Sequence, residues 1–406
     1  MRMKQKALVL SVLIGVLFIV GALVFAPAQA QKTEQILKIG VIQPMTGSGA
    51  AWGIGAVNGQ QIAVDEINEA GGINVKGVRY KLELVVEDDK YSGEAGLAAA
   101  NKLITRDKVF CLSGLLASAV VKAVQGLTEP MKYMTLTNGY SPEILKSGAS
   151  YSWRPSLCPQ EIAPVAFAWF QKQYPKVTKM LHLTKNDATG WGSADAEIKL
   201  WTRMGLQVIG KEFYEPGTKD FTPIVTKVIG QKPELVAMAG TAPGDSALIL
   251  KLFHEMGFKP YLIHTGGYGT LSDTVKICGK EAMEGALTIN IDYSSPRAEE
   301  SVKRFYQKYT TKFKGAWNDI GIWDGEYDQM FVLKAALEKA QSFDHTALKR
   351  VMEDPSFRYK SIYGEGRFGG VSVYGINHQG IVPVFISMIK GGEASLVAKE
   401  SLPSDY

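Results

Sequence analysis

The sequence predicts an α/β protein made of two similar halves, each with a mainly parallel sheet flanked by helices. Short apolar segments typical of buried strands alternate with amphipathic segments that have helical spacing. This alternation occurs twice, once before and once after about residue 154. No long segment rich in Pro, Ser or Gly separates the two series, which indicates short crossings between the halves rather than a flexible tether.

The first half contains alternating strands and helices. Apolar residues three, four or seven positions apart mark the helices, and Gly71–Gly72 ends the first of them. Alternating apolar residues mark the strand before Asp88. The β-α-β-α order favours parallel pairing with helices on both faces of the sheet. The predicted elements are strands over 37–42, 80–87, 109–112 and 133–136 and helices over 55–70 and 94–106.

The second half repeats this pattern. A helix is expected where Ile249, Leu252, Phe253 and Met256 fall on one side. Two further helices are marked by apolar residues over 302–309 and 330–340, and strands return near the end of the chain. The predicted strands cover 179–183, 235–239, 261–264, 285–291 and 382–388.

Composition excludes several classes of protein. The 406 residues are 46% hydrophobic and 21% charged, which is typical of a globular protein and not of a disordered or multi-span membrane protein. The net charge of +5 is too weak to indicate nucleic-acid binding. Three cysteines allow one disulfide at most, and the spacing does not select a pair.

The first 30 residues have the pattern of a secretory signal. Three basic residues precede an apolar segment over 7–25, and Ala28-Gln29-Ala30 supplies the small residues of a cleavage site. We therefore expect cleavage after Ala30 and a periplasmic or released product. The alternative is a retained membrane anchor, since 19 apolar residues can just span a bilayer.

No pattern of residues indicates an enzyme. The five histidines include no zinc-protease motif, since His254-Glu255 lacks a second histidine. The sequence contains neither a nucleophile elbow nor a nucleotide phosphate loop. The glycine-rich segment over 47–53 fits a dinucleotide fingerprint poorly, and suits a loop whose backbone a ligand approaches. We expect no catalytic residue, no metal and no cofactor.

Seven segments in order resemble one known family. They are "LKIGVIQPMTGSGAAWG", "GQQIAVDEINEAGGINVKG", "VVEDDKYSGEAGLAAANKLI", "TEPMKYMTLTNGYSPEI", "TKNDATGWG", "GTKDFTPIVTKV" and "WDGEYDQMFVLKAALEKA". The chain is thereby similar to the periplasmic leucine/isoleucine/valine-binding proteins, the type I solute-binding proteins of ABC importers. The resemblance runs from about Leu37 to Lys390.

The resemblance implies two lobes joined by three hinge crossings, with a ligand bound between the lobes by hinge closure. It assigns 36–153 plus 288–365 to the first lobe and 154–287 plus 366–398 to the second. It also implies a small-molecule ligand, an ABC permease in the inner membrane as partner, and a monomer that binds no nucleic acid. An extracytoplasmic ligand sensor is the alternative from another class.

The resemblance also places candidate ligand-binding residues, and the sequence departs from the family at several of them. Where the family offers hydroxyls to a ligand carboxylate, this chain has Ala117, with Ser118 adjacent, and Tyr140. Where it pairs the ligand ammonium with a glutamate, the loop over 265–268 has no carboxylate. The candidate site residues are Trp52, Ala117, Ser118, Asn138, Gly139, Tyr140, Trp191, Thr241, Gly267 and Tyr268.

The missing carboxylate and the added aromatic rings indicate the chemical class of the ligand. An α-ammonium removed from water needs a paired carboxylate, because an unpaired buried charge is costly. Trp52 and Trp191, in glycine-flanked loops, supply aromatic rings instead. We expect an aromatic or apolar carboxylate or amide as ligand, with a branched-chain amino acid as the alternative. Arg154 is either a carboxylate clamp or part of a hinge salt bridge.

Overall fold

The computed structural model describes residues 35–146, 148–269, 271–291, 299–314 and 322–402. The predicted signal segment lies outside these residues. Two large sheets and one small antiparallel sheet are present. We call the six-stranded sheet with its helices the first lobe and the seven-stranded sheet with its helices the second lobe. The residue boundaries predicted for the lobes stay a prediction.

The sheet of the first lobe has the strand order β2-β3-β1-β4-β5-β6. Strands β1, β4, β5 and β6 pair in parallel, whereas β2 and β3 form an antiparallel hairpin at one edge. The strands are β1 (Gln35–Gln43), β2 (Ile73–Val75), β3 (Val78–Asp88), β4 (Leu112–Gly114), β5 (Thr135–Leu136) and β6 (Ser152–Trp153).

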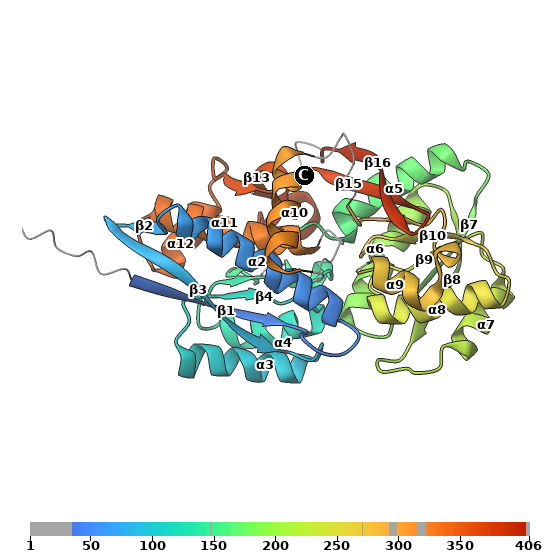
Figure 1. Cartoon of the computed structure of the whole chain (residues 1–406), viewed down its shortest axis with the longest axis horizontal. Helices are drawn as coiled ribbons and strands as arrows, with labels where there is room; N and C mark the ends of the chain where they lie inside the picture. Colours follow the sequence, from blue (N-terminus) through green and yellow to red (C-terminus); the bar gives the residue numbers. More distant parts are fainter. Residues whose placement is uncertain (1–34, 147, 270, 292–298, 315–321, 403–406) are drawn as a thin grey trace, which may run out of the picture. The chain divides into compact units, whose positions relative to one another are not determined.

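Two groups of helices cover this sheet. Helices α2, α10 and α11 pack together on one face, and α3 and α4 lie on the other, as Figure 1 shows. Their bounds are α2 (Ala50–Glu69), α3 (Gly93–Lys102), α4 (Ser118–Thr128), α10 (Glu300–Lys312), α11 (Ile322–Ala340) and α12 (His345–Met352), with a π-helix, η1 (Leu103–Asp107), after α3 and a 3-10 helix, η2 (Pro142–Ile144), after β5.

The sheet of the second lobe has the order β16-β15-β11-β10-β9-β7-β8. Five of its strands pair in parallel, and the last two are antiparallel at the edge. The strands are β7 (Lys179–Lys185), β8 (Gln207–Tyr214), β9 (Leu235–Ala237), β10 (Tyr261–His264), β11 (Leu287–Thr288), β15 (Val384–Lys390) and β16 (Glu393–Glu400).

The helices of the second lobe also lie on both faces of its sheet (Figure 1). They are α5 (Pro159–Gln173), α6 (Ala188–Arg203), α7 (Thr222–Gln231), α8 (Pro243–Glu255) and α9 (Leu271–Cys278), with a 3-10 helix, η3 (Lys280–Ala282). The small third sheet contains β12 (Tyr359–Ser361), β13 (Gly364–Gly369) and β14 (Gln379–Ile381), and α13 (Val371–Tyr374) lies between the last two.

Near-continuous apolar strands explain why both faces are covered. Successive side chains of a strand point to opposite faces, so an apolar run needs packing partners on both sides. In β7, Met180 packs with the core that contains α5 and α6, whereas Leu181 packs with the core that contains α7 and α8. In the first lobe Ile39 and Ile42 divide between the two helix layers in the same way.

Arg154 connects a crossing between the lobes to the first sheet. The residue is fully buried, and its guanidinium donates to Gln379 Oε1 at 2.6 Å, Gly139 O at 2.7 Å and Ser141 O at 3.3 Å. A β-bridge also joins the backbones of Arg154 and Gln379. These contacts, with one side-chain amide and two backbone carbonyls, favour a structural role at the hinge.

Three further observations concern the described residues. Among them, no helix combines the length and the apolar character needed to cross a bilayer, and no group of three or more metal-ligating side chains is assembled. Cys111, Cys158 and Cys278 are free thiols, and all three are buried.

Candidate functional site

Strand order places the candidate site. In the first sheet β1 lies between β3 and β4, and in the second sheet β7 lies between β8 and β9. At such positions successive connections leave the sheet in opposite directions, and a crevice forms outside the carboxyl ends of the strands. The loops that follow β1, β4, β7 and β9 are therefore the expected ligand-binding loops.

Three of these four loops meet around Trp52. This residue lies in the first turn of α2, directly after the β1 loop, and only 4% of it is exposed. It packs against Leu116 from the β4 loop and Ala242 from the β9 loop of the other lobe, with Tyr91 partly buried beside them. We call these four residues the interlobe cluster. Trp52 is thus brought to the contact between lobes that the sequence predicted.

The β4 and β7 loops meet at Ser118, the first residue of α4. The Ser118 backbone N–H donates to the hydroxyl of Thr189 at 3.0 Å, and Ser118 Oγ accepts from the Ser141 N–H at 2.9 Å. Both hydroxyl residues are buried. Because the N-terminal turn of a helix favours negative charge, this is a suitable position for a ligand carboxylate.

Thr189 is a site residue that the sequence analysis missed. Helix α6 begins beside it, where the Asp187 side chain accepts from the Gly190 N–H at 2.9 Å and caps the helix. A Cβ on Gly192 would lie 2.7 Å from the Ser141 Cα, so only glycine permits this close approach of α6 to the first lobe. The available signal was the glycine-flanked "TGWG" segment, in which only Trp191 was chosen.

The loop over 138–140 lies beside Ser118. Asn138 and Gly139 are buried, and the Gly139 carbonyl accepts from Arg154. Tyr140 is 6% exposed and packs in the apolar core that includes α4. Ala117 is also buried and is the N-cap residue of α4. The predicted first-lobe residues therefore surround one helix N-terminus.

The predicted second-lobe residues are more scattered. Trp191 is 50% exposed, and its indole N–H donates to Asn186 Oδ1 at 2.8 Å, so the structure does not bring it to Trp52. Tyr268 is fully buried in the core under α8, edge-on to His264. Thr241 is buried in the loop after β9, where its hydroxyl donates to Leu183 O. Gly267 is buried in the loop after β10.

Charged side chains that the sequence analysis did not select lie close to the interlobe cluster. Lys185 is 4% exposed; its ammonium lies 2.8 Å from Asp187 Oδ2 and 3.7 Å from the centre of the Tyr91 ring. Asp245 of α8 accepts from the Tyr214 hydroxyl at 2.9 Å, and burial raises the pKa of its carboxyl group. Both carboxylates therefore already have partners within the second lobe.

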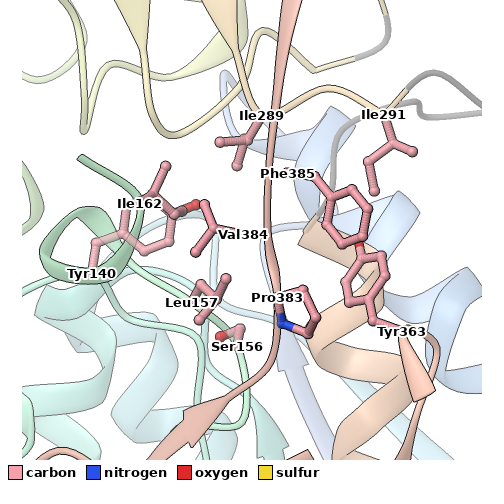
Figure 2. A pocket seen from close by; sticks show the side chains of 10 residues that line it. All are labelled: Tyr140, Ser156, Leu157, Ile162, Ile289, Ile291, Tyr363, Pro383, Val384 and Phe385. Atoms are coloured by element: carbon pink, nitrogen blue, oxygen red, sulfur yellow. The ribbon is translucent and has the colours of Figure 1, made fainter. Parts of the chain in front are cut away.

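A separate small cavity of about 40 Å³ lies where the crossings between the lobes run side by side. Figure 2 shows its apolar lining, which includes Tyr140, Leu157 and Ile289. A volume of this size suits a few water molecules and not an organic ligand. The cavity contains no residue of the interlobe cluster, and we assign it to the hinge.

Comparison with known proteins identifies the family. The model of a periplasmic binding protein family matches residues 36–394. The chain belongs to this family of periplasmic binding proteins. The Leu/Ile/Val-binding protein BraC3 of Rhizobium johnstonii is similar to it, with 29% identity over 355 residues that cover 86% of this chain and 91% of the relative.

Solved structures agree on the fold of this periplasmic binding protein. A leucine-binding protein LivK of Thermotoga maritima superposes with a TM-score of 0.76 at 24% identity, covering 91% of this chain and 100% of that chain. An ABC-transporter solute-binding protein of R. palustris in complex with benzoate gives 0.75 at 18% identity, covering 91% and 98%. The predicted α/β fold with two lobes is confirmed.

Proposed function

We propose that this periplasmic binding protein captures an aromatic carboxylate between its lobes and delivers it to an ABC permease. The buried indole of Trp52, between loops of both lobes, carries the proposal. A flat ring gains burial and stacking against such an indole. The first turn of α4 at Ser118 offers backbone N–H groups to a carboxylate, where Thr189 now supplies the acceptor.

An unmodified amino acid fits this site less well. Its ammonium would need a carboxylate, and those of Asp187 and Asp245 near the cluster are engaged with Lys185 and Tyr214. Burial raises the pKa of the third carboxyl, Asp89 beside Tyr91, to about 7, which makes it a poor partner for a cation. One solved relative holds benzoate, another 4-hydroxybenzoate and another 3,4-dihydroxybenzoic acid, which supports the aromatic class. The names of curated relatives support a second candidate, a branched-chain amino acid.

A thermal-shift panel tests the ligand class. Benzoate, 4-hydroxybenzoate, leucine and isoleucine are added to the purified protein at a series of concentrations. A ligand present at 100 times its Kd stabilises the folded state by about 2.7 kcal/mol, which is a clear rise in Tm. We expect this rise with the aromatic acids and a smaller one with the amino acids. A rise confined to leucine and isoleucine would replace the proposed ligand class by the second candidate.

We further propose that the protein acts in the periplasm as a monomer, after removal of residues 1–30. Ala28 and Ala30 supply the small side chains that a signal peptidase requires. N-terminal sequencing of protein from a periplasmic extract should therefore begin at Gln31. Recovery of the protein only from membranes, with Met1 retained, would instead establish an uncleaved anchor.

A further inference from the structure

Lys185 and Tyr91 form a contact between the two lobes beside the packing of Trp52. Lys185 is the last residue of β7 in the second sheet, and Tyr91 follows β3 of the first sheet. The Lys185 ammonium lies over the face of the Tyr91 ring, 3.7 Å from its centre. An ammonium in this position is attracted by the ring quadrupole, most strongly where water is excluded.

Both partners are held in place within their own lobes. Asp187 pairs with the Lys185 ammonium at 2.8 Å while it caps α6, so the cation is aimed by the same residue that starts the helix. Tyr91 has a φ of 59°, in the left-handed region, and its N–H donates to Asp89 Oδ1 at 2.7 Å. A non-glycine residue held in this region is a feature that clusters at functional positions.

The Tyr91 ring also lies next to the Trp52 indole, which we propose contacts the ligand. The centre of the Tyr91 ring lies 6.3 Å from the centre of the Trp52 ring. A Cβ on Gly49 would lie 2.8 Å from Cδ2 of the Tyr91 ring. The glycine-rich loop before α2 therefore gives the ring the room that it needs. Closing the lobes brings Lys185 onto a ring whose position is already fixed, so little conformational entropy is lost in forming the contact.

We propose that Lys185 and Tyr91 form a closure latch that stabilises the closed arrangement of the lobes and thereby sets how much binding energy a ligand must provide. A ligand can shift the lobes only by its differential affinity for the closed state. An interaction made only on closure therefore adds to the affinity for any ligand. The latch is independent of the ligand class proposed above, and it can be tested with the ligand-free protein.

Disulfide trapping measures closure directly. A Cβ at position 244, at the start of α8, would lie 3.9 Å from the Cβ of Ser48 in the first lobe, which is the separation found in disulfides. Ser48 is exposed, and the three native thiols are buried. The rate at which the Ser48→Cys/Gly244→Cys protein forms its disulfide under a fixed oxidant then reports the closed population, without any ligand.

In this background, Lys185→Met should slow trapping by about tenfold, the factor for losing a partly desolvated cation–π contact. Tyr91→Leu should slow it equally, whereas Tyr91→Phe and Lys185→Arg should retain most of the rate. Lys185→Met and Tyr91→Leu combined in one protein should slow trapping no further than either substitution alone, because both remove the same contact.

Lys211 provides a matched control. Its ammonium lies 5.3 Å from the centre of the Phe213 ring on the same strand, β8, so this cation–π contact does not join the lobes. Lys211→Met should leave the trapping rate unchanged. Trapping of either Lys185→Met or Tyr91→Leu at the parent rate would overturn the latch, and so would multiplicative effects of the two substitutions. Far-ultraviolet circular dichroism confirms that each variant is folded.

Discussion

Replacing Arg154 by methionine should lower the free energy of unfolding by about 3–4 kcal/mol, a loss at the upper end for single substitutions. The guanidinium is fully buried and donates to three acceptors, which the change would leave without this donor. Hydrogen bonds from a charged group are the stronger ones, and an unpaired buried acceptor carries its full desolvation cost. Urea denaturation followed by tryptophan fluorescence measures this loss.

Arg358 is the matched control for this substitution. It also donates to backbone carbonyls, those of Pro355 and Phe357, but its side chain is 41% exposed, so water can replace it. Arg358→Met should change the free energy of unfolding by about 0.5 kcal/mol or less. Arg154→Lys should recover only part of the loss, because an ammonium lacks the planar fork that reaches several acceptors. A loss below about 1 kcal/mol for Arg154→Met would contradict this structural role.

The order of strands and helices could be predicted because buried strands and amphipathic helices have different periods. The helix over 55–70 was predicted in the right place, but α2 begins at Ala50, five residues earlier. Glycines at 53 and 55 hid those turns, and Gly53 is needed because a Cβ there would lie 2.1 Å from the Pro44 carbonyl oxygen. The strand predicted over 109–112 begins only at Leu112, because the preceding residues connect η1 to the sheet.

The antiparallel hairpins were harder to predict. Strands of three residues, such as β2, β12 and β14, are too short to show a period. Helices α5, α6, α7 and α9 were not predicted either. Helix α5 has an internal proline at 164, and α6 has two glycines in its first turns, so intrinsic propensity argued against both. Packing against the second sheet overrides that propensity.

The candidate site could be predicted from the sequence only where a residue type is distinctive. Trp52 was selected because the family resemblance places a ligand-facing ring at this position in a glycine-flanked loop, and the structure places it at the interlobe contact. Lys185 and Tyr91 gave no such signal, and the glycine-flanked segment around Thr189 indicated Trp191 instead, because the roles of all three depend on partners more than 70 residues away. Trp191 and Tyr268 were selected for the same kind of reason, but Trp191 lies at the surface and Tyr268 lies in the core. An aromatic residue in a loop can occupy either place.

Trp52→Ala should weaken the binding of benzoate by about thirtyfold, or about 2 kcal/mol. The wild-type protein should bind benzoate at least about tenfold more tightly than leucine. A planar ring against the indole gains burial and stacking, whereas leucine gains only burial and must leave its ammonium without a carboxylate. Because Trp52 also packs against Leu116 of its own lobe, the substitution costs some stability, so the readout is calorimetric affinity on protein shown to be folded.

Trp191→Ala is the matched control for Trp52→Ala. It tests whether the loss of benzoate affinity is specific to Trp52 or follows from removing any indole near the contact between the lobes. The Trp191 ring is 50% exposed and bonded to Asn186, so its removal should change benzoate affinity by less than about threefold. The hypothesis that two indoles flank the ligand predicts equal losses for both substitutions. Equal losses would therefore show that Trp191 turns inward when the ligand binds. Submicromolar binding of leucine with no response to benzoate would contradict the aromatic preference itself, and would leave the fold and the family unchanged.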